Sequence, residues 1–230
     1  MFDYSDIYDP DAGYDSTISF ETAKKIKKHV KKGTTILDIG CGTGIISSNF
    51  KENEITLLDQ SKKYLKIAKK RVKHSEVHNI EYLNFFSEKI YDNIFMFNIL
   101  HEQVNIDDAI KKANSLLKVS GKLFLSYPNS SSLHRIVGNH LNIIENLDTT
   151  VSKKAEKLGT LRLLDETTVI RILKKYQFEI LDNQGVCFKP YPNHIMEKLG
   201  KELIQSFNKI SDIYPNFSAM KLIIAEKSSK

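Results

Sequence analysis

Short apolar runs alternate with amphipathic, lysine-rich segments along the first 128 residues of the chain. The runs TILDI, ITLL and IFMFNIL are rich in β-branched and aromatic residues, which is typical of strands buried on both faces of a parallel sheet. Between them, apolar residues recur at helical spacing among lysines, which predicts amphipathic helices. The pattern predicts strands over 35–39, 55–58, 80–83, 94–100 and 122–127, and helices over 17–30, 45–50, 61–72 and 106–118.

Five alternations of strand and helix predict an α/β fold with a doubly wound, mostly parallel sheet. After Pro128 the chain is richer in Ser, Asn and His, which favours a helical insertion over 129–165. Beyond it, the pattern predicts helices over 167–176 and 195–210 and strands over 178–181, 186–189 and 219–226. We expect a single domain over 1–230, divided into an N-terminal lid and helix (1–33), a core (34–128), the insertion (129–165) and C-terminal helices and strands (166–230).

Composition narrows the class of protein. The net charge of +6 comes from lysines spread over helical faces, which is typical of solvated surfaces, so no nucleic-acid partner is expected. The two cysteines lie far apart, at Cys41 and Cys187, and form neither a disulfide framework nor a metal site, so no metal is expected. No signal peptide and no apolar run of the ~18 residues that a membrane span needs is present, which favours a cytoplasmic protein. A homodimer stays open.

A glycine loop follows the first predicted strand. Gly40, Gly42 and Gly44 permit a backbone that a ligand can approach closely, at the start of a segment with free N–H groups. The dinucleotide spacing G-x-G-x-x-G would need a glycine where Ile45 stands, and no phosphate-binding G-x-x-x-x-G-K-[ST] is present. Asp38, just before the loop, disfavours a pyrophosphate and suits a cationic ligand.

Asp59 follows the second predicted strand, roughly 20 residues after the loop, where an acid in this topology accepts hydrogen bonds from ribose hydroxyls. An Asp after a strand is more often a turn residue or a helix cap. Its position relative to the glycine loop reverses that judgement and favours a nucleoside-containing ligand.

The pair LDIGCGTG and LLDQS resembles the first two motifs of the class I S-adenosylmethionine-dependent methyltransferases. The resemblance implies a Rossmann-like, seven-stranded sheet with the last strand pair antiparallel, and S-adenosylmethionine as cofactor, released as S-adenosylhomocysteine. It places the methionine part of the cofactor by Asp38 and the loop residues Gly40, Cys41, Gly42 and Gly44. It also implies that Asp59 holds the ribose, Gln60 lies by the adenine, and Asn98 and Ile99 line the sulfonium end.

One segment departs from that family. Many members carry an acid after the third strand that binds the adenine amine, whereas the segment here reads YLNFFSEK. We therefore expect the adenine contact from Asn84, Phe86 or Ser87, with Phe86 the preferred residue.

The acceptor side is expected in the insertion. Methyl transfer is a displacement that needs alignment, and a hydroxyl acceptor also needs a base. PNSSSLHRIVG alone is best read as a capped helix with His134 in solvent, but it resembles a branch of the methyltransferases associated with bacterial surface-polysaccharide and modified-sugar pathways. That branch has Gly-His-x-Arg where this chain has Gly159-Thr160-Leu161-Arg162, so His134 is the preferred general base and His101 the next.

Basic and aromatic residues complete the predicted acceptor site. Arg135, Arg162 and Lys189 are candidates to pair with a phosphate or carboxylate, and surface charge is the alternative for each. Tyr14, with Tyr4 and Tyr8, folds over the ligands as a lid or packs in the core. The sequence thus predicts O-methylation of a small sugar-containing acceptor, nucleotide-linked or a surface-glycan precursor. The alternatives are a phenol or quinol O-methyltransferase and a non-catalytic S-adenosylmethionine-binding protein.

Overall fold

A seven-stranded sheet forms the centre of the computed structural model, which describes residues 3 and 5–229. The strand order is β3-β2-β1-β4-β5-β7-β6; β7 is antiparallel to both of its neighbours, and the other pairs are parallel. The strands are β1 (Thr35–Ile39), β2 (Glu54–Asp59), β3 (Glu76–Asn79), β4 (Tyr91–Phe97), β5 (Leu117–Pro128), β6 (Phe178–Val186) and β7 (Met220–Lys227). The predicted doubly wound α/β fold is confirmed.

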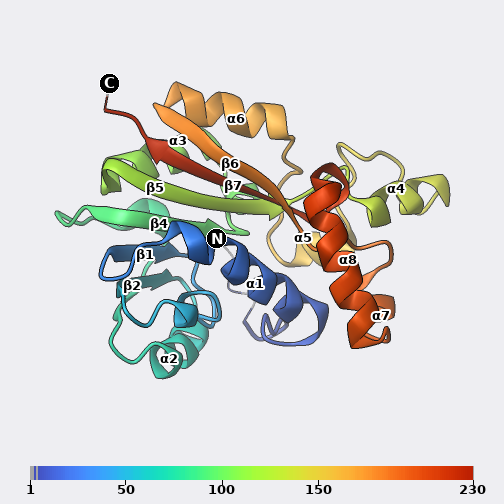
Figure 1. Ribbon diagram of the computed structural model, residues 1–230, viewed down its shortest axis with the longest axis horizontal. Helices are drawn as coiled ribbons and strands as arrows, with labels where there is room; N and C mark the ends of the chain where they lie inside the picture. Colours follow the sequence, from blue (N-terminus) through green and yellow to red (C-terminus); the bar gives the residue numbers. More distant parts are fainter. Residues whose placement is uncertain (1–2, 4, 230) are drawn as a thin grey trace.

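Helices cover both faces of the sheet (Figure 1). α3 and α6 pack on one face, and α1, α2 and α8 pack on the other. Short 3-10 helices lie at 27–29, 47–49, 82–84, 100–102 and 215–217. The α-helices are α1 (Gly13–Ile26), α2 (Lys62–Arg71), α3 (Ile106–Leu116), α4 (Leu133–His140), α5 (Lys153–Lys157), α6 (Glu166–Lys175), α7 (Asn193–Met196) and α8 (Lys201–Ile213).

Alternate residues of the central strands enter different cores, as the two-residue period of a strand requires. In β4, Ile94 and Met96 join the cluster under α3 and α6, whereas Phe95 and Phe97 join the cluster under α1 and α2. The Phe95 ring lies 5.2 Å from that of Phe50, 5.3 Å from Phe97 and 5.2 Å from Phe124, centroid to centroid. This aromatic cluster supports the sheet directly below the glycine loop.

The third strand lies earlier than predicted. β3 is Glu76–Asn79, not 80–83, because an edge strand needs no continuous apolar run. The apolar residues that suggested a strand belong instead to the turn after it. There Tyr82 is buried and its hydroxyl donates to the carbonyl of Ala109 in α3.

The C-terminal elements also differ in their boundaries. β6 extends without a break from the strand expected at 178–181 to Val186, with a bulge between Ile180 and Asp182. The separate strand expected at 186–189 is wrong, because the chain leaves the sheet at Cys187, which has φ 56°. The helix expected at 195–210 is divided into α7 and α8. The insertion after β5 is helical as predicted and carries α4 and α5.

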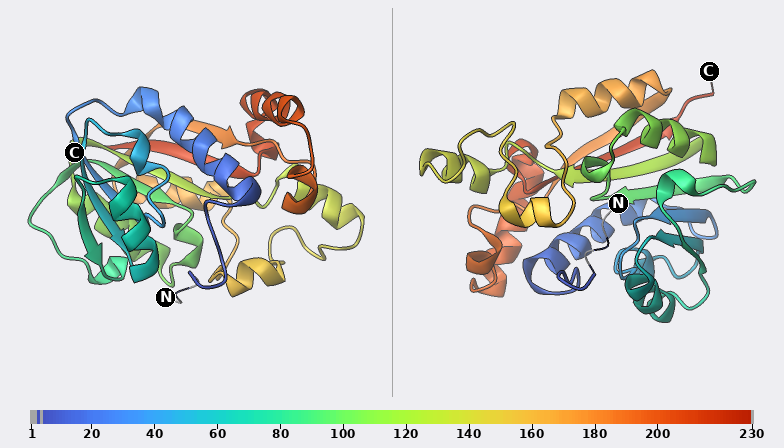
Figure 2. Two further views of the ribbon diagram at one scale, coloured as in Figure 1. Left: turned by 90° about the horizontal axis from the view of Figure 1, so that it is seen from below. Right: turned by 180° about the vertical axis from the view of Figure 1, so that it is seen from behind.

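The carboxyl ends of β1, β2, β4 and β5 meet at one edge of the sheet, as they do in any parallel sheet of this order. The chain returns to this edge three more times: as the segment before α1, as the insertion with α4 and α5, and as α7 (Figure 2). Segments far apart in the sequence therefore surround the ends of the strands.

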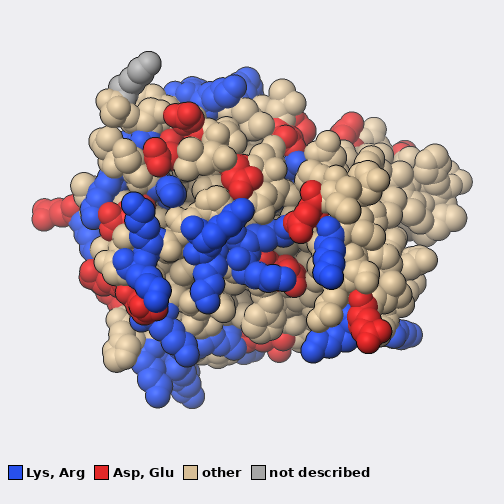
Figure 3. Space-filling view, in the orientation of Figure 1, with Lys and Arg blue, Asp and Glu red and all other residues tan. Residues whose placement is uncertain are grey.

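The surface agrees with the solvated lysines expected from the sequence. Lys and Arg side chains are interspersed with Asp and Glu on the face seen in Figure 3, and few charges lie over the end that carries α4. Lys24 and Lys28, at the end of α1, are largely exposed. Among the described residues, no helix is long and apolar enough to cross a membrane.

The aromatic cluster makes a stability prediction. Phe95→Ala removes a ring that is 0% exposed, so we expect the free energy of unfolding to fall by about 3–5 kcal/mol in urea denaturation. Phe20→Ala, on the exposed side of α1 at 58% exposure, is the control and is expected to change it by less than about 0.5 kcal/mol. Equal losses in the two variants would contradict the placement of this core.

Candidate functional site

A cavity of about 760 Å³ lies at the carboxyl edge of the sheet. Its lining comes from the glycine loop, the ends of β2 and β4, the segment before α1, the insertion and α7. Its floor is therefore fixed by the sheet, and its walls come from the three excursions of the chain.

The glycine loop leaves room for a ligand. Gly42 has φ +52°, and a Cβ built on it would meet nothing within 4 Å. Gly40 has φ +66°, and a Cβ there would lie 2.4 Å from Cγ2 of Ile99 at the end of β4. The first glycine therefore permits close packing of the loop on β4, and the second keeps open the space above it.

Asp59 holds the loop in this conformation. One carboxylate oxygen accepts the Gly42 N–H at 2.8 Å, and the other accepts the Ser61 N–H at 2.8 Å. Ser61 is the N-cap of α2, as its hydroxyl accepts the Tyr64 N–H. Burial raises the pKa of Asp59 above its ordinary value. The carboxylate lines the cavity, where ligand hydroxyls can reach it.

Asp38 is a second carboxylate at this end of the cavity. It is 3% exposed and accepts a hydrogen bond from the Ser47 hydroxyl at 2.6 Å. Burial raises the pKa of Asp38 to about 7; the Ser47 hydrogen bond opposes this, and the charge of Asp59 adds to it. Among the described residues, neither Asp38 nor Asp59 has a salt-bridge partner. This half of the cavity therefore favours a ligand that brings a positive charge and hydroxyl donors.

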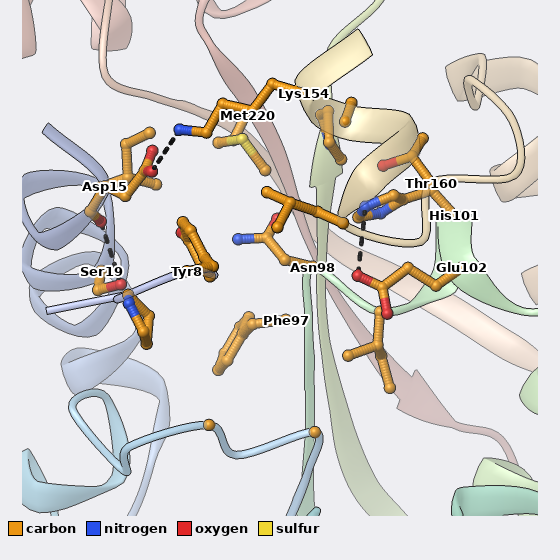
Figure 4. A pocket seen from close by; sticks show the side chains of 18 of the residues that line it. Tyr8, Asp15, Ser19, Phe97, Asn98, His101, Glu102, Lys154, Thr160 and Met220 are labelled. Carbon is orange, nitrogen blue, oxygen red and sulfur yellow. Dashed lines mark hydrogen bonds and ion pairs between the residues drawn. The ribbon is translucent and has the colours of Figure 1, made fainter. Parts of the chain in front are cut away.

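The end of β4 separates this half from the rest of the cavity. Asn98 has φ 57°, a left-handed conformation that Asn tolerates better than most residues. Its side chain reaches into the cavity near Phe97 and Met220 (Figure 4). Ile99 is buried against Gly40, so both residues lie where the two halves meet.

His101 lies just beyond, in the turn after β4. It is 6% exposed, its Nδ1 has no hydrogen-bond partner among the described residues, and its Nε2 lies 3.9 Å from Oε1 of Glu102 (Figure 4). Burial lowers the pKa of His101 to about 4, so the imidazole is neutral near pH 7. A neutral imidazole in a cavity is able to accept a proton.

His134 also lines the cavity, at the start of α4. Its backbone N–H donates to the carbonyl of Lys189 at 3.1 Å, and its Nδ1 has no partner among the described residues. Burial, followed by the charges of Lys189 and Arg135, lowers the pKa of His134 to about 3. His134 is thus neutral like His101, but cations surround it in place of a carboxylate.

A hydrogen-bonded chain crosses the wall beside His134. The Lys189 ammonium donates to Oδ1 of Asn193 at 2.8 Å, and the Asn193 amide donates to Oδ1 of Asp15 at 2.8 Å. Nζ of Lys154, on α5, lies 3.5 Å from Oδ2 of Asp15 (Figure 4). Burial lowers the pKa of Lys189 to about 8. The chain joins α1, α5 and α7 across the cavity.

Most residues predicted for the site meet in this one cavity. Gly44 packs on Ala68 of α2 behind the loop. The predicted residues that line the cavity are Asp38, Gly40, Cys41, Gly42, Asp59, Gln60, Asn98, Ile99, His101, His134, Arg135 and Lys189.

Phe86 is not among the described residues that line the cavity. Its side chain is 87% exposed, with Nζ of Lys112 4.6 Å from the ring centroid. Because β3 ends at Asn79, the residues that reach the cavity after it are Ile80, Glu81 and Tyr82. Glu81 is thus an acid after the third strand, which the misplaced strand boundary concealed.

The tyrosines predicted to form a lid do not share one role. Tyr8 lines the cavity, and Tyr4 lies outside the described residues. Tyr14 is 3% exposed in the core under α1, and its N–H donates to Oε1 of Glu197 at 3.1 Å. Tyr14 therefore has the core position that was its alternative.

The two arginines hold backbone carbonyls. Arg135 lines the cavity, but its guanidinium donates to the carbonyls of Ser130, Leu147 and Thr150 and thereby supports the insertion. Arg162, which is not among the described lining residues, donates to the carbonyl of Val104. Arg135 thus contributes charge to the cavity, while its described hydrogen bonds go to the insertion.

The segment before α1 is tied to the glycine loop by residues that the sequence did not single out. The Asp11 carboxylate accepts from both terminal nitrogens of Arg71, at 3.0 and 2.8 Å, and from the Thr43 hydroxyl at 2.7 Å. The Tyr64 hydroxyl donates to the carbonyl of Tyr8 at 2.6 Å. These contacts fix one wall of the cavity on the loop and α2.

No group of three or more His, Cys, Asp or Glu side chains among the described residues is placed to hold a metal ion.

The chain matches a family described as "Methyltransferase domain" over residues 15–183. An uncharacterized protein of Methanocaldococcus jannaschii is 30% identical over 209 residues, which are 86% of this chain and 80% of that protein. A demethylmenaquinone methyltransferase of Listeria welshimeri is 28% identical over 125 residues, which are 47% of this chain and 53% of that enzyme.

Solved structures share the fold at low sequence identity. The N-methyltransferase NodS from Bradyrhizobium japonicum, in complex with S-adenosylhomocysteine, superimposes with a TM-score of 0.64 at 13% identity. The match covers 97% of this chain and 92% of NodS. At this identity the likeness concerns the fold alone.

The buried carboxylate at the loop predicts a pH dependence. Because the pKa of Asp38 is about 7 when folded and 3.8 ordinarily, the folded state keeps a proton that the unfolded state loses. Stability conferred by this group is therefore lost as pH rises from about 4 to about 7. We expect Asp38→Asn to remove that loss in urea denaturation across this range.

Glu88→Gln, at an exposed position, is the matched control and is expected to follow the wild-type pH curve. An Asp38→Asn curve parallel to that of the wild type would show that Asp38 keeps an ordinary carboxyl in the folded protein.

Proposed function

The chain belongs to the methyltransferase domain family and is an S-adenosylmethionine-dependent methyltransferase, and from this premise we propose that it methylates a hydroxyl of a small sugar-containing acceptor. The acceptor class would be a nucleotide-linked sugar or a surface-glycan precursor. The observation that carries the proposal is the second half of the cavity, where neutral histidines and a half-buried lysine lie beyond Asn98 and Ile99.

The carboxylate half would hold the donor. Asp59 would accept hydrogen bonds from the ribose hydroxyls, and Asp38 with the glycine loop would accommodate the cationic methionine part. Glu81 and Gln60, which follow β3 and β2, line the cavity and would hold the adenine. When bound, S-adenosylmethionine supplies an electrophilic methyl group on a sulfonium.

Uncharged polar side chains favour a polyhydroxylated acceptor. They can donate to and accept from hydroxyls without a charge of their own. Those that line the cavity include Gln103, Ser152 and Thr160.

His101 is the better of the two histidines as proton acceptor. A base that takes the hydroxyl proton becomes an imidazolium, and Glu102 lies 3.9 Å away to stabilise that charge. At His134 the same charge would form beside Lys189 and Arg135, which oppose it. We therefore assign the base to His101, and His134 to the binding of the acceptor.

Methylation of a phenol or quinol is the second candidate. The similarity to a demethylmenaquinone methyltransferase favours it, although that match covers 47% of this chain. A sugar and a quinol differ in their need for polar partners, so activity on one class and not on the other separates the two proposals.

Calorimetric titration and an acceptor screen test the function. S-adenosylmethionine and S-adenosylhomocysteine are expected to bind, and Asp59→Asn to weaken both by about tenfold or more, because two ribose hydroxyls lose a charged acceptor. Release of S-adenosylhomocysteine is then measured with sugar nucleotides, free sugars and phenols. Turnover with phenols and none with any sugar would overturn the acceptor proposal.

Histidine variants test the assignment of the base. His101→Asn is expected to lower turnover about 100-fold or more with unchanged donor affinity, since a positioned base contributes that much. His134→Asn is expected to raise KM for the acceptor more than it lowers kcat. The reverse outcome, with turnover lost in His134→Asn and kept in His101→Asn, would show that His134, in the insertion, is the general base.

A further inference from the structure

The ammonium of Lys189 is a half-buried cation with spare hydrogen-bonding capacity. An ammonium has three N–H donors, and Oδ1 of Asn193 is the one acceptor recorded for it among the described residues. Its nearest carboxylate on the hydrogen-bonded chain, that of Asp15, is reached through the Asn193 amide. A half-buried charge left in this state favours a ligand that supplies the missing acceptors.

Charged side chains of both signs lie around Lys189. Arg135 and Lys154 are the further cations that line this part of the cavity, against the carboxylates of Asp15 and Glu197. The described hydrogen bonds of the Arg135 guanidinium all go to backbone carbonyls, which leaves its positive charge without a bonded carboxylate. Lys154 lies 3.5 Å from Asp15, and the charge of Asp148 acts on Arg135, whereas among the described residues no carboxylate lies within ion-pair distance of Lys189.

His134 adds a neutral donor at the same place. The backbone N–H of His134 donates a hydrogen bond to the backbone carbonyl of Lys189, so the two residues are neighbours in the cavity wall. Nδ1 of its imidazole has no described partner. It also lies in the first turn of α4, whose dipole favours a negative charge.

We propose that Lys189 and His134 form a seat for an anionic group of the methyl acceptor, a carboxylate or a phosphate, so that the enzyme selects an acidic sugar over a neutral one. This inference rests on the proposed function and deepens it. Lys189 supplies the charge and His134 a hydrogen bond. Asn193 and Asp15 act as positioning residues that aim the ammonium into the cavity.

Lys189 and His134 line the same cavity as the carboxylates of the donor half. An acceptor held there by its acidic group extends from the α4 and α7 wall toward Asn98, where the two halves meet. The acidic group thereby fixes which end of the acceptor faces the donor. A neutral sugar lacks that anchor and leaves the ammonium without an acceptor.

Binding of matched probes tests the seat without knowledge of the true acceptor. The probes are D-glucuronate, D-glucose 1-phosphate and D-glucose, titrated by calorimetry and NMR into the full chain saturated with S-adenosylhomocysteine. Either acidic probe, or both, is expected to bind about tenfold or more tightly than glucose. The stronger of the two identifies the anion as carboxylate or phosphate.

Variants assign that preference to the seat. Lys189→Gln is expected to abolish the preference for the acidic probe, and Lys189→Arg to retain part of it. Asn193→Ala keeps the charge but loses its alignment, so it is expected to weaken the preference partially. Lys198→Gln, exposed and next to α7, is the control that keeps it. Unchanged affinity for S-adenosylhomocysteine verifies that each variant is folded.

An NMR titration of the Lys189 side chain provides a readout that needs no variant. An anion on the seat is expected to raise the pKa of Lys189 by about one unit or more, because an opposite charge favours the ammonium. Equal binding of glucose and both acidic probes, or a Lys189 pKa that neither acid changes, overturns the seat. An acidic probe that binds but is never methylated, with no sugar methylated either, overturns the proposed function and leaves the seat standing.

Discussion

The site depends on two carboxylates, the buried Asp38 and the half-buried Asp59, that have no salt-bridge partner among the described residues. Asp38 and Asp59 stand at the ends of adjacent parallel strands, where the strand order brings them together. Burial alone would make both costly, so each is held by hydroxyl or backbone donors: Ser47 for Asp38, and Gly42 and Ser61 for Asp59. The same bonds set the shape of the glycine loop. The negative potential of the donor half and the open space above it therefore have one origin.

The acceptor half is built on a different physical basis. Its charged groups include Lys189, Arg135, Lys154, Asp15 and Glu197, and they come from α4, α5, α7 and α1 and the loops beside them, not from the sheet. Because each excursion contributes only a few side chains, the wall depends on bonds between excursions. The chain through Asn193 is the clearest of these. One cavity thus joins a negative half fixed by strands to a positive half assembled from loops.

The sequence predicted the donor half far better than the acceptor half. The glycine spacing, Asp38 and Asp59 are local signals, since they follow apolar runs that are strands for reasons visible in the pattern. β3 was misplaced because an edge strand buries little, so its polar residues Glu76–Asn79 did not resemble a strand, and Glu81 was overlooked with it. Asn193 is close to Lys189 in the sequence, but Asp15 is more than a hundred residues away from both. No spacing rule reveals that Asp15 and Asn193 meet. Tyr14 and Arg135 show the same limit, because burial and carbonyl contacts decide their roles.

The backbone conformation at Asn98 restricts which residues related chains can carry at this position. Its backbone is left-handed at the place where donor and acceptor halves meet, a conformation that β-branched and bulky residues disfavour. We therefore expect backbone geometry, before side-chain chemistry, to limit the residues at this position. Asparagine, aspartate and glycine are the residues that adopt this conformation most readily. The residue found there in a homologue reports on the retention of the turn after β4. Differences in acceptor choice would instead lie in the side chains of the cavity walls, where the backbone conformation does not restrict the residue type.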